Sequence, residues 1–198
     1  VREPAAGLEV MAVAPDGVIE ALYRPASHFL WAVQWHPEFL YKVDPRFGSN
    51  EEFKELTKNT HQKGMKMVMD MVFNHCGSSH WWMQDLPFKN WINNDGVFIQ
   101  TNHATVSVMD VHAAPSDRNT FLNGWFTRGM PDLNQTNAHL ATYLIQNSIW
   151  WIEYADLDGF RVDTYSYNDK EGIAKWTKAI TDEYPYFNIA GEVWMHDQ

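Results

Sequence analysis

Two carboxyl side chains at the ends of predicted strands, Asp163 and Glu192, are the residues best placed to act together in catalysis. They lie about one strand–helix–strand repeat apart, so they can stand at the tips of neighbouring strands. Carboxyls about 5 Å apart suit retaining glycoside hydrolysis, because an ionised carboxylate attacks the anomeric carbon while a protonated partner donates to the leaving oxygen. Arg161 precedes Asp163 on the same strand face, and its fixed positive charge would keep Asp163 ionised. Strand-end carboxylates also cap helices or pair with arginine, so spacing alone leaves a structural role open.

The elements that would position these side chains alternate in type from residue 51 onward. Periodicity predicts a helix at 51–63 ended by Gly64, a strand at 65–73, an irregular segment at 76–133, a helix at 139–154, a strand at 158–163, a helix at 170–184 and a strand at 187–193. The first of these strands (MKMVMDMVF) is a continuous apolar run, which is typical of burial on both faces of a parallel sheet. The alternation predicts an α/β fold, either an open doubly wound sheet or part of a (β/α)8 barrel.

Further polar side chains belong to the strand predicted at 65–73. Asp70 lies within it, and Asn74 and His75 follow at its end. Because the carboxyl ends of parallel strands meet at one face, we expect these residues to lie near Asp163 and Glu192.

Four short motifs carry a resemblance to a known family. They are DMVFNH (Asp70–His75), MPDLN (Met130–Asn134), GFRVD (Gly159–Asp163) and GEVW (Gly191–Trp194). In order and spacing they resemble consecutive signature regions of the α-amylase family of glycoside hydrolases, most closely bacterial amylases and neopullulanases that act on starch, pullulan or cyclodextrins. The resemblance implies a partial (β/α)8 TIM-type barrel at 41–75 and 134–198, with 76–133 as an irregular insertion domain.

The resemblance also implies roles for single residues. Asp163 would be the nucleophile, Glu192 the acid/base and Arg161 the support of the nucleophile. His75 would bind the sugar at the cleaved position, and Asp70 would hold its strand end in place.

Asn74 would help to hold that strand end and is the candidate ligand of calcium, the only cofactor that we expect. Clustered oxygen atoms, which calcium prefers, could come from Asn74 and carboxylates of the insertion. Trp81, Trp82 and Tyr165 are candidates for the substrate groove, since exposed aromatic rings form platforms for sugars.

The sequence departs from the family pattern at two places that bear on activity. It ends at Gln198, before the family's last signature, which supplies a third carboxylate, and TYSY (Thr164–Tyr167) lacks a Lys and a His that many α-amylases have there. We therefore expect a retaining hydrolase of α-1,4-glucosidic bonds in starch or related α-glucans whose activity is impaired by truncation. The alternative is an inactive remnant that binds α-glucan.

The first 40 residues have a different character, with strands predicted at 8–14, 18–23 and 29–35. The segment 6–40, with FLWAVQWHPEF, resembles the carboxyl-terminal end of class I glutamine amidotransferases, in particular γ-glutamyl hydrolases. His36 and Glu38 would be relics of an amidase, because Cys76 follows them instead of preceding them. We expect a chimera joined between about Glu38 and Lys42, with the strand at 29–35 standing parallel beside 65–73.

Composition and charge limit the classes of function. A net charge of −10 without a basic run disfavours nucleic acid and anionic membranes as partners. The sequence has no run of about 18 apolar residues and no signal-peptide pattern, so we expect a soluble protein of unassigned compartment. Its single cysteine excludes an intramolecular disulfide, and its histidines lack zinc-site spacing. A chain too short to close a barrel of about 250 residues would leave sheet edges exposed, which predicts a homo-oligomer.

Overall fold

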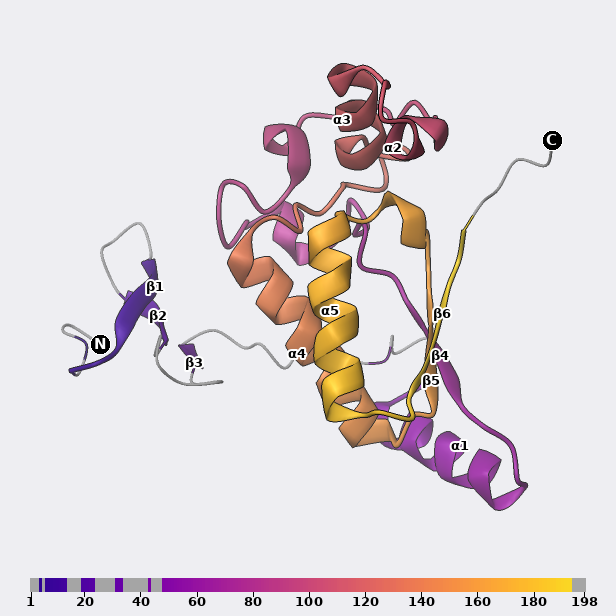
Figure 1. Cartoon of the computed structure of the whole chain (residues 1–198). Helices are drawn as coiled ribbons and strands as arrows, with labels where there is room; N and C mark the ends of the chain where they lie inside the picture. Colours follow the sequence, from indigo (N-terminus) through magenta and orange to yellow (C-terminus); the bar gives the residue numbers. More distant parts are fainter. Residues whose placement is uncertain are drawn as a thin grey trace. The chain divides into compact units, whose positions relative to one another are not determined.

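The computed structural model describes residues 4, 6–13, 19–23, 31–33, 43 and 48–193. The chain divides into two compact units between Asn50 and Glu51, and each unit is described by itself (Figure 1). Within the described residues, no helix is both long enough and apolar enough to cross a membrane.

The first unit holds a small antiparallel sheet. Its strands follow chain order: β1 (Glu9–Val13), β2 (Ile19–Tyr23) and β3 (Trp31–Val33). All three strands were expected, and the placement of 29–35 beside 65–73 stays a prediction, because it joins two units that are each described by themselves. The third strand comprises Trp31–Val33. These residues pair antiparallel with β2, the strand nearest to them in sequence, as consecutive strands commonly do. His36 and Glu38 lie outside the described residues.

The second unit contains a parallel sheet and its crossover helices, as predicted. Helix α1 (Asn50–Gln62) leads into β4 (Val68–Met71), and α4 (Ala138–Ala155), β5 (Gly159–Val162), α5 (Lys170–Glu183) and β6 (Asn188–Gly191) follow. The three strands are parallel and lie in the order β4-β5-β6. Gly64 has a φ of 72°, the left-handed conformation in which a glycine ends a helix at low cost.

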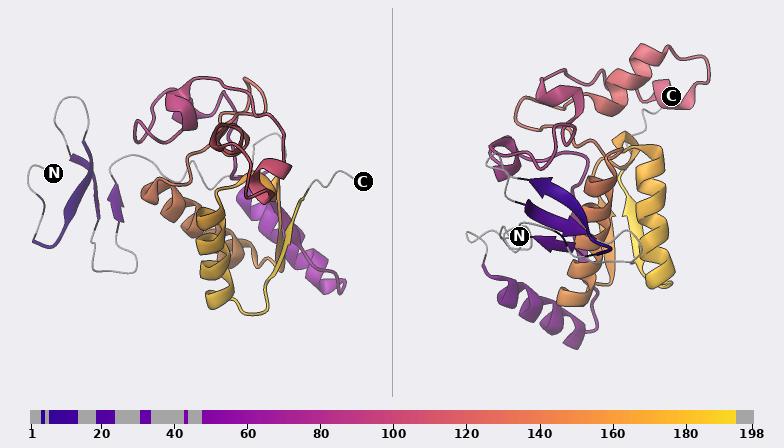
Figure 2. Two further views of the ribbon diagram at one scale, coloured as in Figure 1. Left: turned by 45° about the horizontal axis from the view of Figure 1, so that its top comes forward. Right: turned by 90° about the vertical axis from the view of Figure 1, so that its left-hand side faces the viewer.

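Helices α4 and α5 lie side by side over the same face of this sheet (Figures 1 and 2). Phe160 of β5 is fully buried, and the ring of Trp176 on α5 lies 4.9 Å from that of Phe73. Trp176 Nε1 also donates to Ser148 Oγ on α4 at 2.8 Å, so the two helices share a polar contact within an apolar layer. Strands in chain order with both crossover helices on one face are consistent with a segment of a barrel.

The expectation that β4 is buried on both faces is wrong. Met71 and Phe73 are 6% and 3% exposed, whereas Val68 and Val72 are 53% and 49% exposed. Side chains of a strand alternate between faces, so the odd-numbered residues pack on the helices and the even-numbered residues, Asp70 among them, face away from them. The apolar sequence of this strand therefore overstates its burial.

The insertion at 76–133 is irregular, as predicted, and lies beyond the end of the sheet to which the strands point (Figure 1). It contains four short helical segments, η2 (Trp81–Met83), η3 (Asn93–Gly96), α2 (Val106–Met109) and α3 (Pro115–Asn123). Helix α3 was not expected, although its sequence carries both usual end signals. Pro115 stands in the first turn and Gly124 follows the last residue.

Candidate active site

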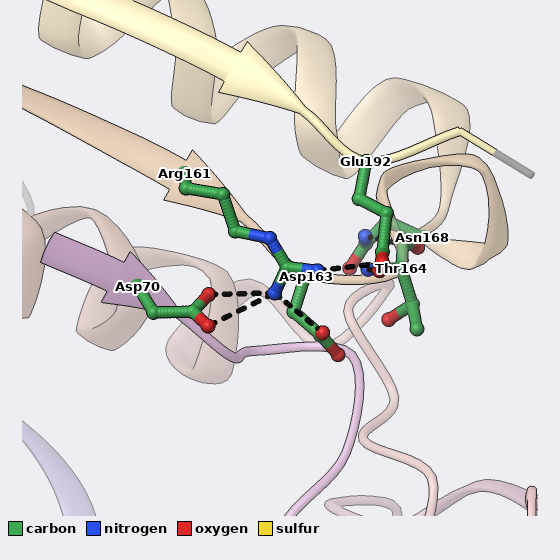
Figure 3. A network of polar contacts seen from close by, with 6 residues as sticks. All are labelled: Asp70, Arg161, Asp163, Thr164, Asn168 and Glu192. Atoms are coloured by element: carbon green, nitrogen blue, oxygen red, sulfur yellow. Dashed lines mark hydrogen bonds and ion pairs between the residues drawn. The ribbon is translucent and has the colours of Figure 1, made fainter. Parts of the chain in front are cut away.

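The ends of β4, β5 and β6 bring three carboxylates together around Arg161 (Figure 3). Arg161 Nη1 donates to both carboxylate oxygens of Asp70 at 2.9 Å and to Asp163 Oδ1 at 2.7 Å. Its other terminal nitrogen, Nη2, lies 2.6 Å from Glu192 Oε1. Asp163 and Glu192 therefore contact the same guanidinium, as expected if neighbouring parallel strands bring them together.

The register of the parallel sheet produces this cluster. Asp70 pairs with Arg161 across the β4–β5 ladder, so their side chains share a face. Val162 pairs with Gly191, and each is followed directly by one of the two carboxyl residues, Asp163 and Glu192. Two further bonds extend the ladders by one residue: Asp163 N–H donates to the Met71 carbonyl at 3.0 Å, and Glu192 N–H donates to the Val162 carbonyl at 2.9 Å.

The cluster has more negative than positive charge. One guanidinium faces three carboxylates, whose side chains are 57% (Asp70), 21% (Asp163) and 27% (Glu192) exposed. Hydrogen bonds to Asp70 and Asp163 raise the pKa of Arg161 further above its usual value, so the arginine stays charged. An excess of negative charge at a strand end can stabilise a positive charge that develops on a bound molecule.

Glu192 is held at both of its oxygens and through its backbone. Oε2 accepts the Thr164 N–H at 3.0 Å while Oε1 contacts Arg161, and the Glu192 carbonyl accepts the Tyr165 N–H at 3.0 Å. The Tyr165 side chain covers Gly191 so closely that a Cβ on that glycine would lie 2.6 Å from Tyr165 Cγ. Tyr165, predicted as a substrate contact, thus lies at the site and also packs on the chain just before Glu192.

His75 lies near the cluster in a mostly apolar setting. Its ring meets that of Phe126 edge-on at 5.5 Å, and its Nδ1 is buried without a hydrogen-bond partner among the described residues. Burial lowers the pKa of His75 below 6.5, and the charge of Asp163 opposes this shift only in part. His75 is therefore a neutral imidazole at neutral pH, which can hydrogen-bond a hydroxyl group.

Asn74 joins the end of β4 to the MPDLN motif. It is buried, its Nδ2 donates to Asp132 Oδ1 at 3.1 Å, and Asn93 Nδ2 donates to the other oxygen, Oδ2, at 2.7 Å. Burial raises the pKa of Asp132 to about 8, although both hydrogen bonds oppose this shift.

These contacts do not fit the predicted calcium site. Calcium takes six to eight oxygen ligands. Asp132 is the only carboxylate that contacts Asn74 among the described residues, and both of its oxygens accept amide N–H groups. No group of three or more His, Cys, Asp or Glu side chains suited to a metal occurs in the described part of the chain.

The two adjacent tryptophans differ in exposure. Trp82 is 4% exposed and its ring meets those of Trp91 and Tyr143 edge-on at 5.3 and 5.4 Å. A ring buried in the insertion cannot serve as a sugar platform, so the expectation for Trp82 is wrong. Trp81 is 36% exposed and remains a candidate.

Three residues that sequence reasoning did not assign complete the site: Thr164, Asn168 and Gln135. Thr164 supplies the N–H bound by Glu192, and Asn168 and Gln135 are buried amides that hold the loop after β5. Amide side chains are frequent next to two of the motifs, in LNQTN (133–137) and in SYND (166–169), and this pattern could have indicated Gln135 and Asn168. The backbone N–H of Thr164 could not have been identified, because every residue except proline has this group.

A family model described as "Alpha amylase, catalytic domain" matches residues 35–192, most of the chain. The chain belongs to the α-amylase family. A separate model, Peptidase C26, matches residues 1–38, so the similarity changes near the predicted join.

Individual relatives of this α-amylase family member agree with the assignment. The intracellular maltogenic amylase of Bacillus subtilis (strain 168) is 30% identical over 161 residues, covering 78% of this chain and 24% of that protein. A cyclomaltodextrinase of Geobacillus thermopakistaniensis (strain MAS1) is 30% identical over 158 residues, covering 79% of this chain and 25% of that protein. The chain thus spans about a quarter of the length of these relatives.

A solved structure gives the same result for the fold. The α-amylase from Geobacillus thermoleovorans, complexed with acarbose, has a TM-score of 0.66 and 34% identity. The match covers 79% of this chain and 32% of that one. The parallel sheet and its helices therefore have the arrangement found in α-amylases.

Proposed function

We propose that the Arg161 cluster is the active site of a retaining glycoside hydrolase that cleaves α-1,4-glucosidic bonds in starch or related α-glucans. One observation carries the proposal: Asp163 and Glu192 follow adjacent parallel strands and contact the same guanidinium, in a cluster with excess negative charge. The relatives named maltogenic amylase and cyclomaltodextrinase, and the acarbose complex, support α-glucans as the substrate class.

In the first step, a carboxylate oxygen of Asp163 forms a bond to the anomeric carbon while the glycosidic C–O bond breaks. Glu192 gives its proton to the leaving oxygen, so the departing sugar leaves as a neutral alcohol. In the second step, water attacks the anomeric carbon, its proton goes to Glu192, and the ester bond to Asp163 breaks. Both steps pass through an oxocarbenium-like transition state.

The surroundings of the two carboxyls support this chemistry. The transition state is positively charged, and the excess of carboxylates around Arg161 would stabilise it. The neutral imidazole of His75 can hydrogen-bond a sugar hydroxyl without adding an opposing positive charge. Tyr165 and Trp81 can contact the rings of a bound oligosaccharide.

The same proposal covers the architecture. Segments 41–75 and 134–198 would belong to a (β/α)8 barrel, 76–133 would be its insertion domain, and 1–40 would derive from an amidotransferase-like protein. The match of residues 1–38 to Peptidase C26 supports the last assignment. Self-association remains a prediction, since Val68 and Val72 are exposed on an outer strand of the sheet. Sedimentation at micromolar concentration measures it.

Amidase activity is the weaker alternative. A nucleophilic cysteine acts as the thiolate. Burial raises the pKa of Cys76 to about 11, so its thiol is protonated at neutral pH. Cys76 is the first residue of the insertion, and its N–H donates to the Pro131 carbonyl at 3.0 Å.

The experiment measures reducing ends released from maltoheptaose by the 198-residue chain, beside Asp163→Asn and Glu192→Gln. Asp182→Asn is the matched control, because Asp182 pairs with Lys178 on the exposed surface of α5. We expect release by the wild type and the control and its loss in both site variants. Equal rates in all four proteins would contradict the proposal. Calorimetric binding of maltoheptaose without turnover would instead identify the chain as an α-glucan-binding remnant.

A further inference from the structure

Two buried amide side chains, Gln135 and Asn168, connect the ends of β4 and β5 to the start of α5. Gln135 Nε2 donates to the Phe73 carbonyl at 3.1 Å and to Asn168 Oδ1, while Gln135 Oε1 accepts the Asp169 N–H at 3.1 Å. Asn168 Nδ2 in turn donates to the Thr164 and Tyr165 carbonyls at 3.1 and 3.2 Å. Both side chains are buried, at 7% and 4% exposure, so these bonds do not compete with water.

Thr164, the residue that Asn168 holds, has an unusual backbone conformation. Its φ is 46° and its ψ is 41°, in the left-handed region that β-branched residues rarely adopt. Such a conformation persists where the surroundings enforce it. In this conformation the Thr164 N–H points to Glu192 Oε2 at 3.0 Å, and Figure 3 shows Asn168 beside this contact.

We propose that Asn168, tethered by Gln135, is a positioning residue that decides which oxygen of Glu192 carries the catalytic proton. The proposal rests on the function proposed above. Oε2 accepts the Thr164 N–H, so a proton on Oε2 would face another donor. Once Oε1 has separated from Arg161, the proton therefore resides on Oε1. Asn168 enforces this choice because it holds Thr164 in the conformation that aims the N–H.

The contact of Oε1 with Arg161 adds a condition. In the structure Oε1 lies 2.6 Å from Nη2, a cationic donor that also disfavours a proton on that oxygen. Glu192 therefore becomes an acid only when Oε1 separates from Arg161, which keeps its contacts to Asp70 and Asp163 through Nη1. A glycosidic oxygen that enters between Oε1 and Nη2 would take the proton from Oε1. In the second step, Oε1 takes a proton back from the attacking water.

The test compares two substrates that differ in their need for an acid. Maltotriose has a poor leaving group that requires protonation, whereas α-maltosyl fluoride loses fluoride with little help. Asn168→Asp replaces the Nδ2 donor with an oxygen that repels the Thr164 and Tyr165 carbonyls. We expect kcat/KM for maltotriose to fall about 100-fold and that for α-maltosyl fluoride less than about 5-fold, since a positioned acid contributes about 10²–10⁴.

The ratio of the two rates does not depend on the folded fraction of a variant, because the same molecules turn over both substrates. Asn119→Asp is the matched control: Asn119 is exposed, and its Oδ1 accepts from Asn123 Nδ2, a role that an aspartate keeps. Gln135→Met removes the tether to Asn168 together with the bonds of Gln135 to Phe73 and Asp169, and it should shift the ratio in the same direction by less. An unchanged ratio in Asn168→Asp overturns the proposal.

A second test follows the wild-type protein by NMR, so its main result does not require Asn168→Asp to fold. The amide proton of Thr164 should change its NMR shift as Glu192 titrates, and this change should disappear in Glu192→Gln. A Thr164 amide insensitive to pH overturns the positioning role. If Asp163→Asn still abolishes hydrolysis in that case, the proposed function stands and only this inference fails. If the wild type turns over neither substrate, both fail.

Discussion

Strand β5 has an ionic cluster at each end, and the two clusters have opposite compositions. At its amino end, Asp158 accepts from Lys66 Nζ, His61 Nε2 and Met67 N–H, each at 2.7 Å. At its carboxyl end, Arg161 donates to or pairs with three carboxylates at 2.6–2.9 Å. One carboxylate is satisfied by several donors in the first cluster, whereas one cation is shared by several carboxylates in the second.

We infer that this difference separates a structural cluster from the proposed active site. Burial alone would raise the pKa of Asp158, but hydrogen bonds from Lys66, Met67 and His61 outweigh it and lower the pKa to about 2. The balanced cluster thus stabilises the junction of α1, β4 and β5. The carboxylates around Arg161 repel one another, which costs stability that a structural role does not explain. Activity and stability should therefore respond in opposite ways at the two ends.

The largest expected effect comes from Asp163→Asn at the carboxyl end. Loss of the nucleophile should lower kcat/KM for maltoheptaose by about 10⁴-fold or more. Because the change also relieves repulsion around Arg161, the free energy of unfolding in urea should not fall. A variant that lost activity together with stability would show that Asp163 is mainly a structural residue.

The second prediction concerns Asp132, a carboxylate that neither cluster contains. Its pKa of about 8 exceeds the value of about 3.9 for an unfolded chain, so the folded state binds more protons between these values. The free energy of unfolding should therefore decrease by a few kcal/mol as pH rises from about 4 to about 8.

Urea denaturation at several pH values measures this slope, and Asp132→Asn should remove it. Excess calcium chloride in the same experiment should leave the slope unchanged, because the contacts of Asn74 do not fit a calcium site. A calcium ion near Asp132 would favour its ionised form, so calcium that abolished the slope in the wild type would support the predicted site.

The parts of the structure that could be predicted from sequence are those governed by local periodicity and strand order. The ranges of β4, α4, β5, α5 and β6 were found within a few residues because their apolar spacing follows from packing on one sheet. The meeting of Asp163 with Glu192 also follows, since parallel strands of similar length end at the same edge.

What could not be predicted depends on contacts distant in sequence. The exposure of Val68 is set by what covers the other face of the sheet, which the composition of β4 does not contain. The burial of Trp82 depends on Trp91 and Tyr143, and the role of Thr164 depends on a backbone N–H. Such features require coordinates, because residue type alone does not specify them.

The third prediction is the counterpart of the first at the amino end of β5. Asp158→Asn removes a charge that three donors share, and should lower the free energy of unfolding by about 2 kcal/mol. The activity of the folded protein should not change. Because the pKa of Asp158 is lower in the folded protein than in the unfolded chain, Asp158 stabilises the fold above the unfolded pKa, and this stability is lost as pH falls. The free energy of unfolding of the wild type should therefore decrease between about pH 4 and pH 2. The variant should show less of this decrease. Equal acid sensitivity of both proteins would contradict this role.

The smallest effect is expected for Asp70→Asn, which tests whether the charge excess itself matters. The substituted amide would keep one oxygen acceptor for Arg161 Nη1 while removing one negative charge, and Asp70 is the most exposed carboxylate of the cluster. We expect kcat/KM to fall about 10-fold, or about 1.4 kcal/mol, with most of the loss in kcat because the cationic transition state is weakened more than substrate binding. Added salt should reduce the difference between variant and wild type, since exposed charges are screened. An increase in KM with kcat unchanged would instead mean that Asp70 only binds substrate. The excess of negative charge would then not be what distinguishes the Arg161 cluster from the Asp158 cluster.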